Sequence, residues 1–388
     1  MLRAKVLAII LAGGPGGRMG VLTDRRAKPS LPFGGHYRLI DIPLSNLRHS
    51  GLADVWVVEQ YLPFSLNDHI ANGRPWDLDR TAGGLRLLPP YEGAPGEGFA
   101  QGNADALHKQ AGLIRDFGPD LVLVLSADQL YRLDFRDVLE THAGTGADLT
   151  MVTTRPGGDL SRFSIVEADA GRVAGFEYKP EQPKTDLAAA EVFLYDAGVL
   201  LETMDLLAAD GQGLQDYGDK LVPYLVRNAA VAEHRLEGYW RDLGTVPSYW
   251  EAHMQLLDGT GFNLQDAGWP VLTAGPQLMP AAVDGARIEQ SLVSAGAAVR
   301  GTVLHSVVGP GAVVEPGAVV KDSVLLHGVR VEAGAELERV IADAGSVVGA
   351  GAKVGGGGDI AVLGQDSLVA AHRLVAAGTE LEPGRRSR

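Results

Sequence analysis

Aliphatic side chains recur at a six-residue interval in the last third of this 388-residue chain. Val293 and Val299 hold the same phase upstream, and Ile341 and Val347 continue it after a slip of two residues. A six-residue period with glycine at the turns is typical of a parallel β-helix, in which each coil contributes one inward aliphatic side chain per face. A low-complexity tract would keep no fixed phase. The unbroken series is Val307, Val313, Val319, Leu325, Val331 and Leu337.

The part before residue 256 has a different pattern, in which short β-branched runs alternate with stretches of helical pattern. Examples of the runs are residues 5–12, 54–60, 120–128 and 148–154, which are apolar almost throughout. Strands that are covered on both faces have this composition. The pattern predicts an α/β domain with a mostly parallel sheet. Ligands of such sheets bind at the carboxyl ends of the strands.

The two patterns predict how the chain is divided. Its length is enough for two domains of ordinary size. We expect an α/β domain over residues 1–255, a linker without clear period over 256–280, a β-helix over 281–375 and a frayed tail over 376–388.

Composition and charge exclude several classes of protein. Hydrophobic residues make up 46% of the chain and charged residues 21%, which fits a folded soluble protein without a membrane partner. The net charge of −14 argues against a nucleic-acid partner, because phosphate backbones need a basic face. The chain has no cysteine, which excludes disulfides and thiolate metal sites and agrees with a cytoplasmic location. The apolar start runs straight into glycines and predicts a first strand rather than a secretory signal.

The first expected strand ends in a glycine-rich segment, LAGGPGGRM at residues 11–19. Glycines after a strand let backbone N–H groups approach a nucleotide closely. Arg18 and Lys28 place two cations where the phosphates of that nucleotide would lie. The spacing fits neither the P-loop nor the dinucleotide-binding pattern. The segment therefore predicts a phosphate site of another kind.

Two aspartates follow expected strands of the same domain. Asp128 comes directly after the apolar run 120–128, and Asp242 follows Trp240 and Arg241. Two carboxylates from separate strands can hold Mg²⁺, which takes few protein ligands and completes its coordination with water and phosphate. A single aspartate in such a place can also be a strand cap or a surface charge.

A series of longer motifs follows one order along nearly the whole chain and resembles the sugar-nucleotide pyrophosphorylases, within them the glucose-1-phosphate adenylyltransferases. The motifs are LAGGPGGR (11–18), LTDRRAKP (22–29), FGGHYRLIDIPLSN (33–46), QY with SL and HI (60–70), LLPP (87–90), GNADA (102–106), DQLY (128–131), FEYKP (176–180), DYGDK (216–220) and YWRDLGT (239–245).

The resemblance implies a fold, a reaction and a set of site residues. The fold would be a Rossmann-like nucleotidyltransferase domain followed by a left-handed parallel β-helix. The reaction would convert ATP and glucose 1-phosphate to ADP-glucose and pyrophosphate, for glycogen or α-glucan synthesis. The family is tetrameric and binds small-molecule effectors near the domain junction, where Arg25 falls.

The implied roles transfer residue by residue. The nucleotide-binding residues would be Leu11, Ala12, Gly13, Gly14, Gly16, Arg18, Lys28, Gln60, Gly102, Asn103 and Ala104. The sugar-phosphate-binding residues would be Tyr178, Lys179, Ala190 and Asp242. Arg18, Lys28 and Asp128 would be catalytic, and Asp128 and Asp242 would hold Mg²⁺.

Several positions of the expected sugar pocket depart from the family. Tyr178 stands where the family has Glu, and residues 189–191 read Ala-Ala-Glu in place of Ser-Met-Gly. Ala100 replaces an aromatic residue before GNADA. The departures leave two alternatives open: a pyrophosphorylase for another sugar phosphate or nucleotide, and a non-catalytic regulatory subunit. The retained Lys179 and the other phosphate and metal residues argue against the second.

Overall fold

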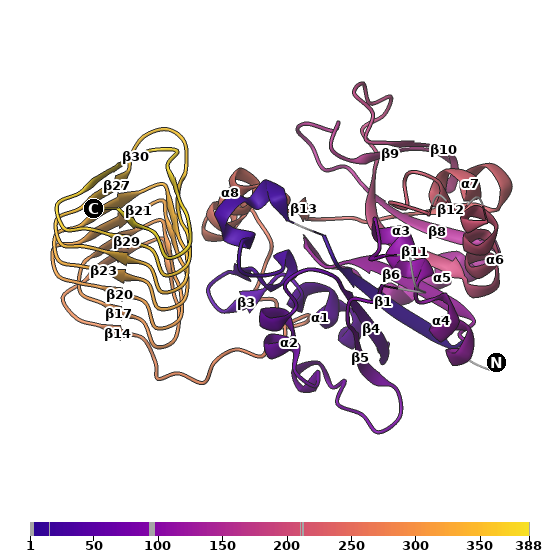
Figure 1. The fold of residues 1–388 in the computed structure, drawn as a ribbon, viewed down its shortest axis with the longest axis horizontal. Coiled ribbons are helices and arrows are strands. Elements are labelled where there is room, and N and C mark those ends of the chain that lie inside the picture. The colour runs from indigo at the N-terminus through magenta and orange to yellow at the C-terminus, as the bar shows by residue number, and fades with distance from the viewer. Residues whose placement is uncertain (1–3, 15, 93–97, 210, 212, 388) are drawn as a thin grey trace. The chain divides into compact units, whose positions relative to one another are not determined.

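The computed structural model describes residues 4–14, 16–92, 98–209, 211 and 213–387. Helices and strands alternate in the N-terminal part, and short strands alone follow from residue 282 onward in the described chain (Figure 1). The predicted order of an α/β domain followed by a parallel β-helix is therefore confirmed. Among the described helices, none is long and apolar enough to cross a membrane.

The chain divides into two compact units that differ from the expected segments. The first contains Met1–Gly14, Ile42–Pro63 and Ile70–Arg241. The second contains Pro15–Asp41, Phe64–His69 and Asp242–Arg388. A boundary near residue 255 does not separate these units, because two early segments of the chain pack with its C-terminal part.

The first unit is built on a nine-stranded sheet. Its strands, in spatial order, are β5 (Gly84–Leu88), β4 (Asp54–Glu59), β1 (Val6–Ala12), β6 (Leu121–Ser126), β11 (Ala188–Asp196), β8 (Leu149–Thr154), β12 (Val231–Arg235), β10 (Arg172–Tyr178) and β9 (Ser164–Asp169). The strands β10 and β11 run antiparallel to the other strands of this sheet. The apolar runs predicted parallel pairing, and this holds from β5 to β6 and between β8 and β12. The pairings of β10 and β11 with their neighbours are antiparallel, so the sheet is mixed rather than mostly parallel.

Both faces of this sheet are covered. In β1, Leu7 and Ile9 join a core with residues of the helices α3, α4, α6 and α7, while Ala8 and Ile10 on the opposite face are also fully buried. The parallel register of β1 with β4 and β6 brings the carboxyl ends of these strands to one edge. Gly13, the residue after β1, therefore lies at the edge where ligands of such sheets bind. The helices are α3 (Asn103–His108), α4 (Ala111–Phe117), α5 (Phe135–Thr145), α6 (Ala197–Ala208) and α7 (Leu221–Asn228).

Further helices and strands lie in the part of the chain before the β-helix. They are β2 (Pro32–Phe33), β3 (Tyr37–Arg38), α1 (Asp41–His49), α2 (Phe64–Ile70), β7 (Gln129–Tyr131), β13 (Trp240–Asp242) and α8 (Val246–Leu257). Residues 258–281 contain no helix or strand, and α8 extends to Leu257, past the start of the linker expected over 256–280.

Three parallel sheets form the β-helix of the second unit. The first contains β14 (Ala282–Val283), β17 (Ala298–Val299), β20 (Val313–Val314), β23 (Arg330–Val331), β26 (Val347–Val348), β29 (Leu368–Val369) and β32 (Arg386–Ser387). The second contains β15 (Arg287–Glu289), β18 (Thr302–Leu304), β21 (Val319–Lys321), β24 (Glu336–Glu338), β27 (Lys353–Gly355) and β30 (Leu374–Ala376). The third contains β16 (Leu292–Val293), β19 (Val307–Val308), β22 (Val324–Leu325), β25 (Val340–Ala342), β28 (Ala361–Leu363) and β31 (Glu380–Leu381).

The phase of the inward side chains corrects the expected unbroken period. The core contains Val308, Val314 and Val320, whereas the sequence pattern predicted their neighbours Val307, Val313 and Val319. In the two coils that contain Asp322 and Arg339, the corner between the second and the third sheet is one residue shorter than the other two corners. Asp322 and Arg339 make these short corners with left-handed φ of 47° and 55°. The sequence does not show this shift, because two adjacent valines stand at each of these three inward positions and either one fits a six-residue period.

The expected frayed tail from residue 376 is instead part of the β-helix. The strands β30, β31 and β32 continue the three sheets. The inward side chains Val375 and Leu381 pack on the core, and Gly378 and Gly384 make the turns with φ of 73°. A single inward aliphatic residue per side is enough to extend a coil, so the polar outer residues of this stretch concealed it.

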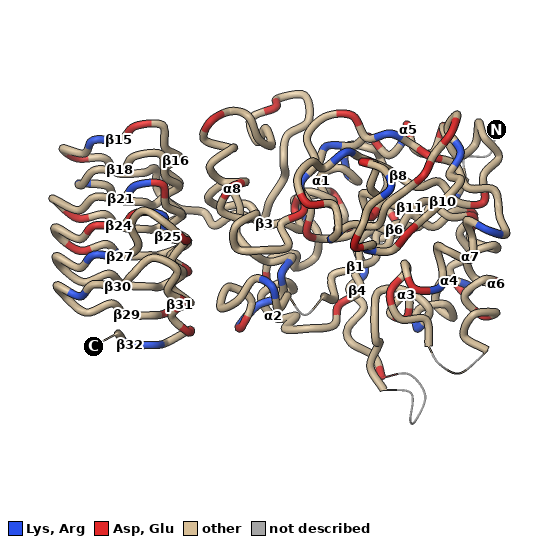
Figure 2. Tube along the Cα trace, turned by 90° about the horizontal axis from the view of Figure 1, so that it is seen from above, with Lys and Arg blue, Asp and Glu red and all other residues tan. Residues whose placement is uncertain are grey.

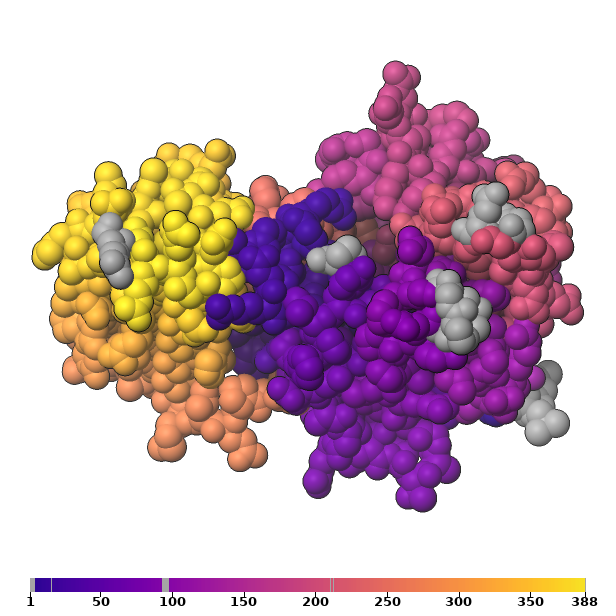
Figure 3. All heavy atoms as spheres, viewed as in Figure 1, coloured from indigo at the N-terminus to yellow at the C-terminus, as the bar shows by residue number. Residues whose placement is uncertain are grey.

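Charged residues of both signs cover the outside of the coils, as Figure 2 shows. Ion pairs join neighbouring coils, for example Lys321 to Glu338 at 2.6 Å and Lys353 to Glu336 at 3.0 Å. These pairs are solvent-exposed and contribute little stability. The coils stack from orange to yellow in Figure 3, and the Val and Leu side chains inside them make the main contribution to stability.

Segments from early in the chain pack with the β-helix inside the second unit. The side chains of Arg26 and Asp343 form an ion pair in which they are 5% and 0% exposed. Trp250 of α8 donates its indole N–H to the carbonyl of Asp322 at 2.8 Å, and the guanidinium of Arg339 lies 4.2 Å from the ring centre of Trp250. These contacts explain why the compact unit includes residues before 255.

One buried histidine of the second unit gives the protein a pH-dependent stability. In α8, His253 Nδ1 donates to the carbonyl of Tyr249 at 2.9 Å, and Gly34 N donates to its Nε2 at 3.3 Å. Burial lowers the pKa of His253 to about 4. The unfolded chain takes up this proton near pH 6.5 and the folded chain does not, so stability falls as pH drops below that value.

We therefore expect His253 to cost roughly 2 kcal/mol of unfolding free energy between pH 7 and pH 5. Urea unfolding of the unmodified protein and of His253→Gln at both pH values measures this, because the variant lacks the titrating group. The variant should lose less stability on acidification. An equal loss in both proteins would contradict the assignment.

Candidate functional site

The turn after β1 packs closely against the residue that follows β4. A side-chain carbon at Gly13 would lie 2.6 Å from Gln60 Oε1, so a larger residue there would have to displace the Gln60 side chain. Within the described chain, Gln60 Nε2 is buried and has no hydrogen-bond partner. Because buried polar atoms in folded proteins are nearly always paired, this donor is suited to an acceptor on a ligand.

The other predicted residues of this segment are split between the two units. In the first unit Leu11 is half-buried, the side chain of Ala12 is buried at the end of β1, and Gly14 is exposed. In the second unit Gly16 has a left-handed φ of 65°, and its carbonyl accepts hydrogen bonds from Met19 N and Thr23 Oγ1.

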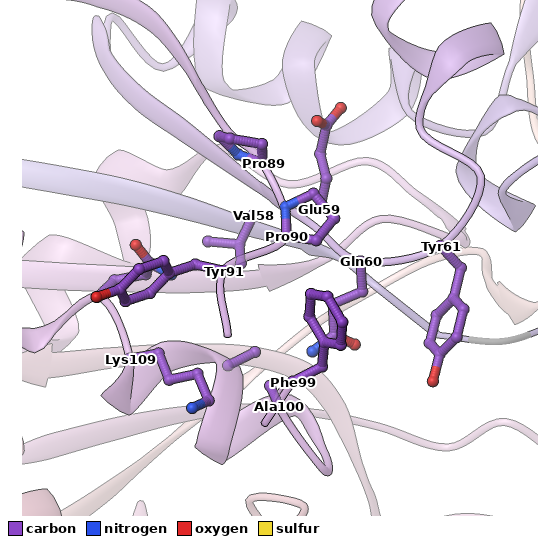
Figure 4. Close-up of a pocket in the computed structure, with 12 residues that line it drawn as sticks. Val58, Glu59, Gln60, Tyr61, Pro89, Pro90, Tyr91, Phe99, Ala100 and Lys109 are labelled. Carbon is purple, nitrogen blue, oxygen red and sulfur yellow. The ribbon is translucent and has the colours of Figure 1, made fainter. Parts of the chain in front are cut away.

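Gln60 also lines a pocket of about 310 Å³ in the first unit (Figure 4). Three of its aromatic residues, Tyr61, Tyr91 and Phe99, are about half exposed. Flat apolar walls with a few polar groups are what a nucleobase needs. The lining residues are Val58, Glu59, Gln60, Tyr61, Pro89, Pro90, Tyr91, Phe99, Ala100, Ala106, Lys109 and Gln110.

The GNADA motif, residues 102–106, forms the N-terminal turn of α3, called the GNADA turn below, and is held against residues 215–217. Ala104 N donates to the carbonyl of Gln215 at 3.0 Å, and Asn103 N donates to Asp216 Oδ1 at 3.1 Å. Tyr217 N in turn donates to Asn103 Oδ1 at 2.6 Å. The predicted nucleotide-binding residues Gly102, Asn103 and Ala104 are thus fixed by a segment to which the sequence analysis assigned no role.

The same segment contacts the predicted sugar-phosphate residues. Lys179 has a left-handed φ of 47°, and its Nζ donates to Tyr178 Oη at 2.7 Å and lies 4.4 Å from the centre of the Tyr178 ring. Tyr178 Oη donates to Asp216 Oδ2 at 2.7 Å. Burial, and then the hydrogen bond to Asp216, raise the pKa of Tyr178 above its usual value, so the phenol keeps its proton.

The ring of Tyr178 is tightly packed. A side-chain carbon at Gly218 would come within 2.0 Å of Tyr178 Cδ2, so a larger residue cannot stand there without moving the ring. The ring of Tyr217 meets it edge-on, with 5.9 Å between the centroids. Tyr178 therefore occupies a fixed place and presents its hydroxyl to Asp216.

Ala190 and its neighbour have unequal access to a ligand. The side chain of Ala190 is fully buried in β11, so it offers a ligand no surface in this structure. Glu191 is half-buried, has a left-handed φ of 52° and accepts a hydrogen bond from Tyr217 Oη at 2.8 Å. Glu191 stands where the family has glycine, and the sequence predicts no function for it. A glycine at this position would have indicated the left-handed backbone conformation that Glu191 adopts here.

Asp128 lies after β6, as expected, and is half-buried. Its Oδ1 accepts a hydrogen bond from Ser126 Oγ at 2.6 Å. Burial, and then the charge of Asp128, raise the pKa of the nearby Tyr131. Trp240, from the YWRDLGT motif, donates to Gln129 Oε1 at 3.3 Å, which ties that motif to the strand after Asp128.

Three predicted site residues come together in the second unit. Lys28 Nζ lies 3.7 Å from Asp242 Oδ1, and the two side chains are 9% and 14% exposed. Gly244 N donates to Asp242 Oδ2 at 3.1 Å, and a side-chain carbon at Gly244 would lie 3.2 Å from Arg18 Nη2. Arg18 is exposed at the start of the 3-10 turn Gly17–Thr23. Two cations beside a carboxylate form a site suited to phosphate groups and a cation.

Arg25, which the family resemblance places near an effector site, makes an ion pair with Asp366 of the β-helix at 3.1 Å. The two side chains are 47% and 67% exposed. The contact joins the segment that carries Lys28 to the β-helix, within the second unit.

Comparison with known proteins agrees with this architecture. The model of the family "Nucleotidyl transferase" matches residues 7–259, and that of "GlmU-like, C-terminal hexapeptide" matches residues 280–359. Three similar proteins, all named glucose-1-phosphate adenylyltransferase, come from Thermomicrobium roseum, Thermotoga neapolitana and Clostridium acetobutylicum.

The similarity to each relative covers most of both chains. The Thermomicrobium protein is 43% identical over 76% of this chain and 70% of its own. The Thermotoga protein is 41% identical over 78% of this chain and 73% of its own. The Clostridium protein is 38% identical over 80% of this chain and 83% of its own. The chain therefore belongs to the nucleotidyl transferase family, as a sugar-nucleotidyltransferase with a C-terminal hexapeptide β-helix.

Proposed function

We propose that this protein makes ADP-glucose and pyrophosphate from ATP and glucose 1-phosphate, for glycogen or α-glucan synthesis. The names of its relatives support this substrate pair. The observation that carries the proposal is the meeting of Arg18 and Lys28 at Asp242, because a largely buried lysine beside a carboxylate and an arginine suits a polyphosphate and its cation.

The reaction needs no covalent enzyme intermediate. A phosphate oxygen of the sugar 1-phosphate forms a bond to the α-phosphorus of the nucleotide, while the bond from that phosphorus to the oxygen bridging to the β-phosphate breaks and pyrophosphate leaves. Catalysis of this kind consists mainly of positioning and charge neutralisation. In our proposal Arg18 and Lys28 hold the triphosphate, Gln60 and residues 102–104 hold the nucleoside, and Lys179 holds the phosphate of the sugar.

We assign Mg²⁺ as the cofactor, with Asp128 and Asp242 as its protein ligands. Half-buried carboxylates are hard oxygen donors of the type that Mg²⁺ prefers. Among the described residues no group of three or more His, Asp and Glu is placed for a metal. Mg²⁺ takes few protein ligands and completes its shell with water and phosphate. When bound, the ion neutralises phosphate charge.

The second candidate function is a pyrophosphorylase for another sugar phosphate or nucleotide, and Tyr178 in place of a glutamate favours it. A pyrophosphate-release panel of four nucleotides against several sugar 1-phosphates separates the candidates. We expect the highest kcat/KM for ATP with glucose 1-phosphate. Higher values for another pair would replace the substrate assignment, and no release from any pair would indicate a non-catalytic regulatory subunit.

The role of Lys179 is tested by its removal. Lys179→Ala should raise the KM for the sugar phosphate by about 10 to 100-fold, because a charge-assisted hydrogen bond is lost, and leave the KM for the nucleotide nearly unchanged. Initial rates with each substrate varied in turn measure both constants. Lys184→Ala is the matched control, since Lys184 pairs with Glu177 on the exposed surface. Equal changes in both KM values would contradict the role.

We further propose that the protein works in the cytoplasm as a homotetramer that binds small-molecule effectors. Exposed β-helix edges favour packing against a further copy. Light scattering at micromolar concentration should give about four times the mass of one chain, which is 40.9 kDa. A monomer under those conditions would contradict the assembly.

A further inference from the structure

A chain of hydrogen bonds runs from Lys179 to the GNADA turn inside the first unit. Lys179 Nζ donates to Tyr178 Oη at 2.7 Å, and Tyr178 Oη donates to Asp216 Oδ2 at 2.7 Å. Asp216 Oδ1 accepts from Asn103 N at 3.1 Å. One carboxylate therefore connects the lysine and the turn, using a different oxygen for each.

The direction of each hydrogen bond is determined by chemistry. The ammonium of Lys179 can only donate, and the carboxylate of Asp216 can only accept. The phenol of Tyr178 must therefore accept from the lysine and give its own proton to the aspartate. Its raised pKa keeps that proton in place over the working pH range.

Packing makes this connection rigid where a lysine would otherwise be mobile. Lys179 is exposed, and a free lysine samples many rotamers. Its left-handed backbone turns the side chain back over the Tyr178 ring, which is itself held between Gly218 and Tyr217. An ammonium held in place before binding loses less entropy when a phosphate arrives.

We propose that Tyr178 and Asp216 are positioning residues that hold Lys179 in a fixed relation to the GNADA turn, so that the binding of the two substrates is coupled through Asp216. The inference rests on the proposed function, in which Lys179 binds the sugar phosphate and residues 102–104 bind the nucleotide. Tyr178 affects the binding of the sugar phosphate alone, because it contacts Lys179. Asp216 affects the binding of both substrates, because it also holds Asn103 in place.

The test compares the KM values of the two substrates. Tyr178→Phe keeps the ring and removes the hydroxyl, and should raise the KM for the sugar phosphate about tenfold while that for ATP changes less than about twofold. Asp216→Ala should raise both KM values by about fivefold or more. Tyr217→Phe removes a hydroxyl from the adjacent ring, which donates to Glu191, and should leave the ratio of the two KM values unchanged.

A double-mutant cycle distinguishes positioning from a general loss of structure. If Tyr178 acts through Lys179, Tyr178→Phe should have no further effect on the KM for the sugar phosphate in the Lys179→Ala background. Additive effects in that background would overturn the proposal. So would a Tyr178→Phe protein in which both KM values rise together or neither does.

The outcomes separate this inference from the proposed function. If Lys179→Ala raises the KM for the sugar phosphate and Tyr178→Phe does not, the lysine binds the substrate and the coupling is wrong. If Lys179→Ala has no such effect, the proposed role of the lysine is wrong and the coupling falls with it. Should Tyr178→Phe melt well below the unmodified protein, the Asp216→Ala variant decides, and a rise in only one KM would overturn the coupling.

Discussion

Asp128→Asn should lower turnover by about two to four orders of magnitude. The substitution preserves the shape of the side chain, and the amide oxygen can still accept the hydrogen bond that Ser126 Oγ donates at 2.6 Å. The variant loses the negative charge, which our proposal uses to hold Mg²⁺. We expect its melting temperature to stay close to that of the unmodified protein, because the only packing change is one isosteric group.

Two measurements make this prediction specific for a metal ligand. The concentration of Mg²⁺ at half-maximal activity should rise in Asp128→Asn, because one of the two carboxylates that we propose as ligands of the ion is gone. Asp159→Asn, a change in an exposed loop where Asp159 accepts from Ser161, should keep both turnover and the Mg²⁺ requirement. A turnover of Asp128→Asn close to that of the unmodified protein would contradict the metal assignment.

The sequence predicted the fold well because both of its patterns come from buried side chains. Apolar runs predicted the parallel strands of the sheet, and spaced aliphatic residues predicted the β-helix. The pattern failed where two residues satisfy it equally: Val313 and Val314 both fit a six-residue count, and only the shortened corner at Asp322 and its equivalents decides that Val314 points inward. Such corners depend on backbone conformation, which hydrophobicity does not report.

Motifs that match a family give the candidate site residues, but they do not show which contacts form between distant parts of the chain. Lys28 and Asp242, more than two hundred residues apart, were each named as a candidate, and the structure brings them together. Asp216 lies in a recognised motif, but the sequence assigned it no role. The residues next to it in the sequence do not show that it accepts hydrogen bonds from both Tyr178 and Asn103. Pairings of that kind follow from tertiary packing alone.

The ion pair between Arg26 and Asp343 is the contact of the second unit whose loss should cost most. Both side chains are almost fully buried, at 5% and 0% exposure. Arg26→Leu leaves the Asp343 carboxylate without this cation, and breaking a buried pair in this way costs about 3 to 5 kcal/mol. We expect a correspondingly large fall in the free energy of unfolding, measured by urea denaturation at pH 7.

The pH dependence of the variant has a defined sign. Burial already raises the pKa of Asp343 and Arg26 opposes that shift, so removing Arg26 should raise the pKa further. The folded variant then holds a proton that the unfolded chain releases above about pH 4, and its stability falls as pH rises. The loss of unfolding free energy in Arg26→Leu, relative to the unmodified protein, should therefore be larger at pH 7 than at pH 5.

Two further variants show whether the cost comes from the unpaired charge. Arg25→Leu removes the neighbouring pair with Asp366, which is largely exposed, and should change stability by less than about 1 kcal/mol. Arg26→Leu combined with Asp343→Leu removes both buried charges and should recover much of the loss, because a buried pair replaced by apolar groups is often neutral. If the double variant is no more stable than Arg26→Leu, the pair stabilises the second unit by its own attraction and the account based on an unpaired carboxylate is wrong.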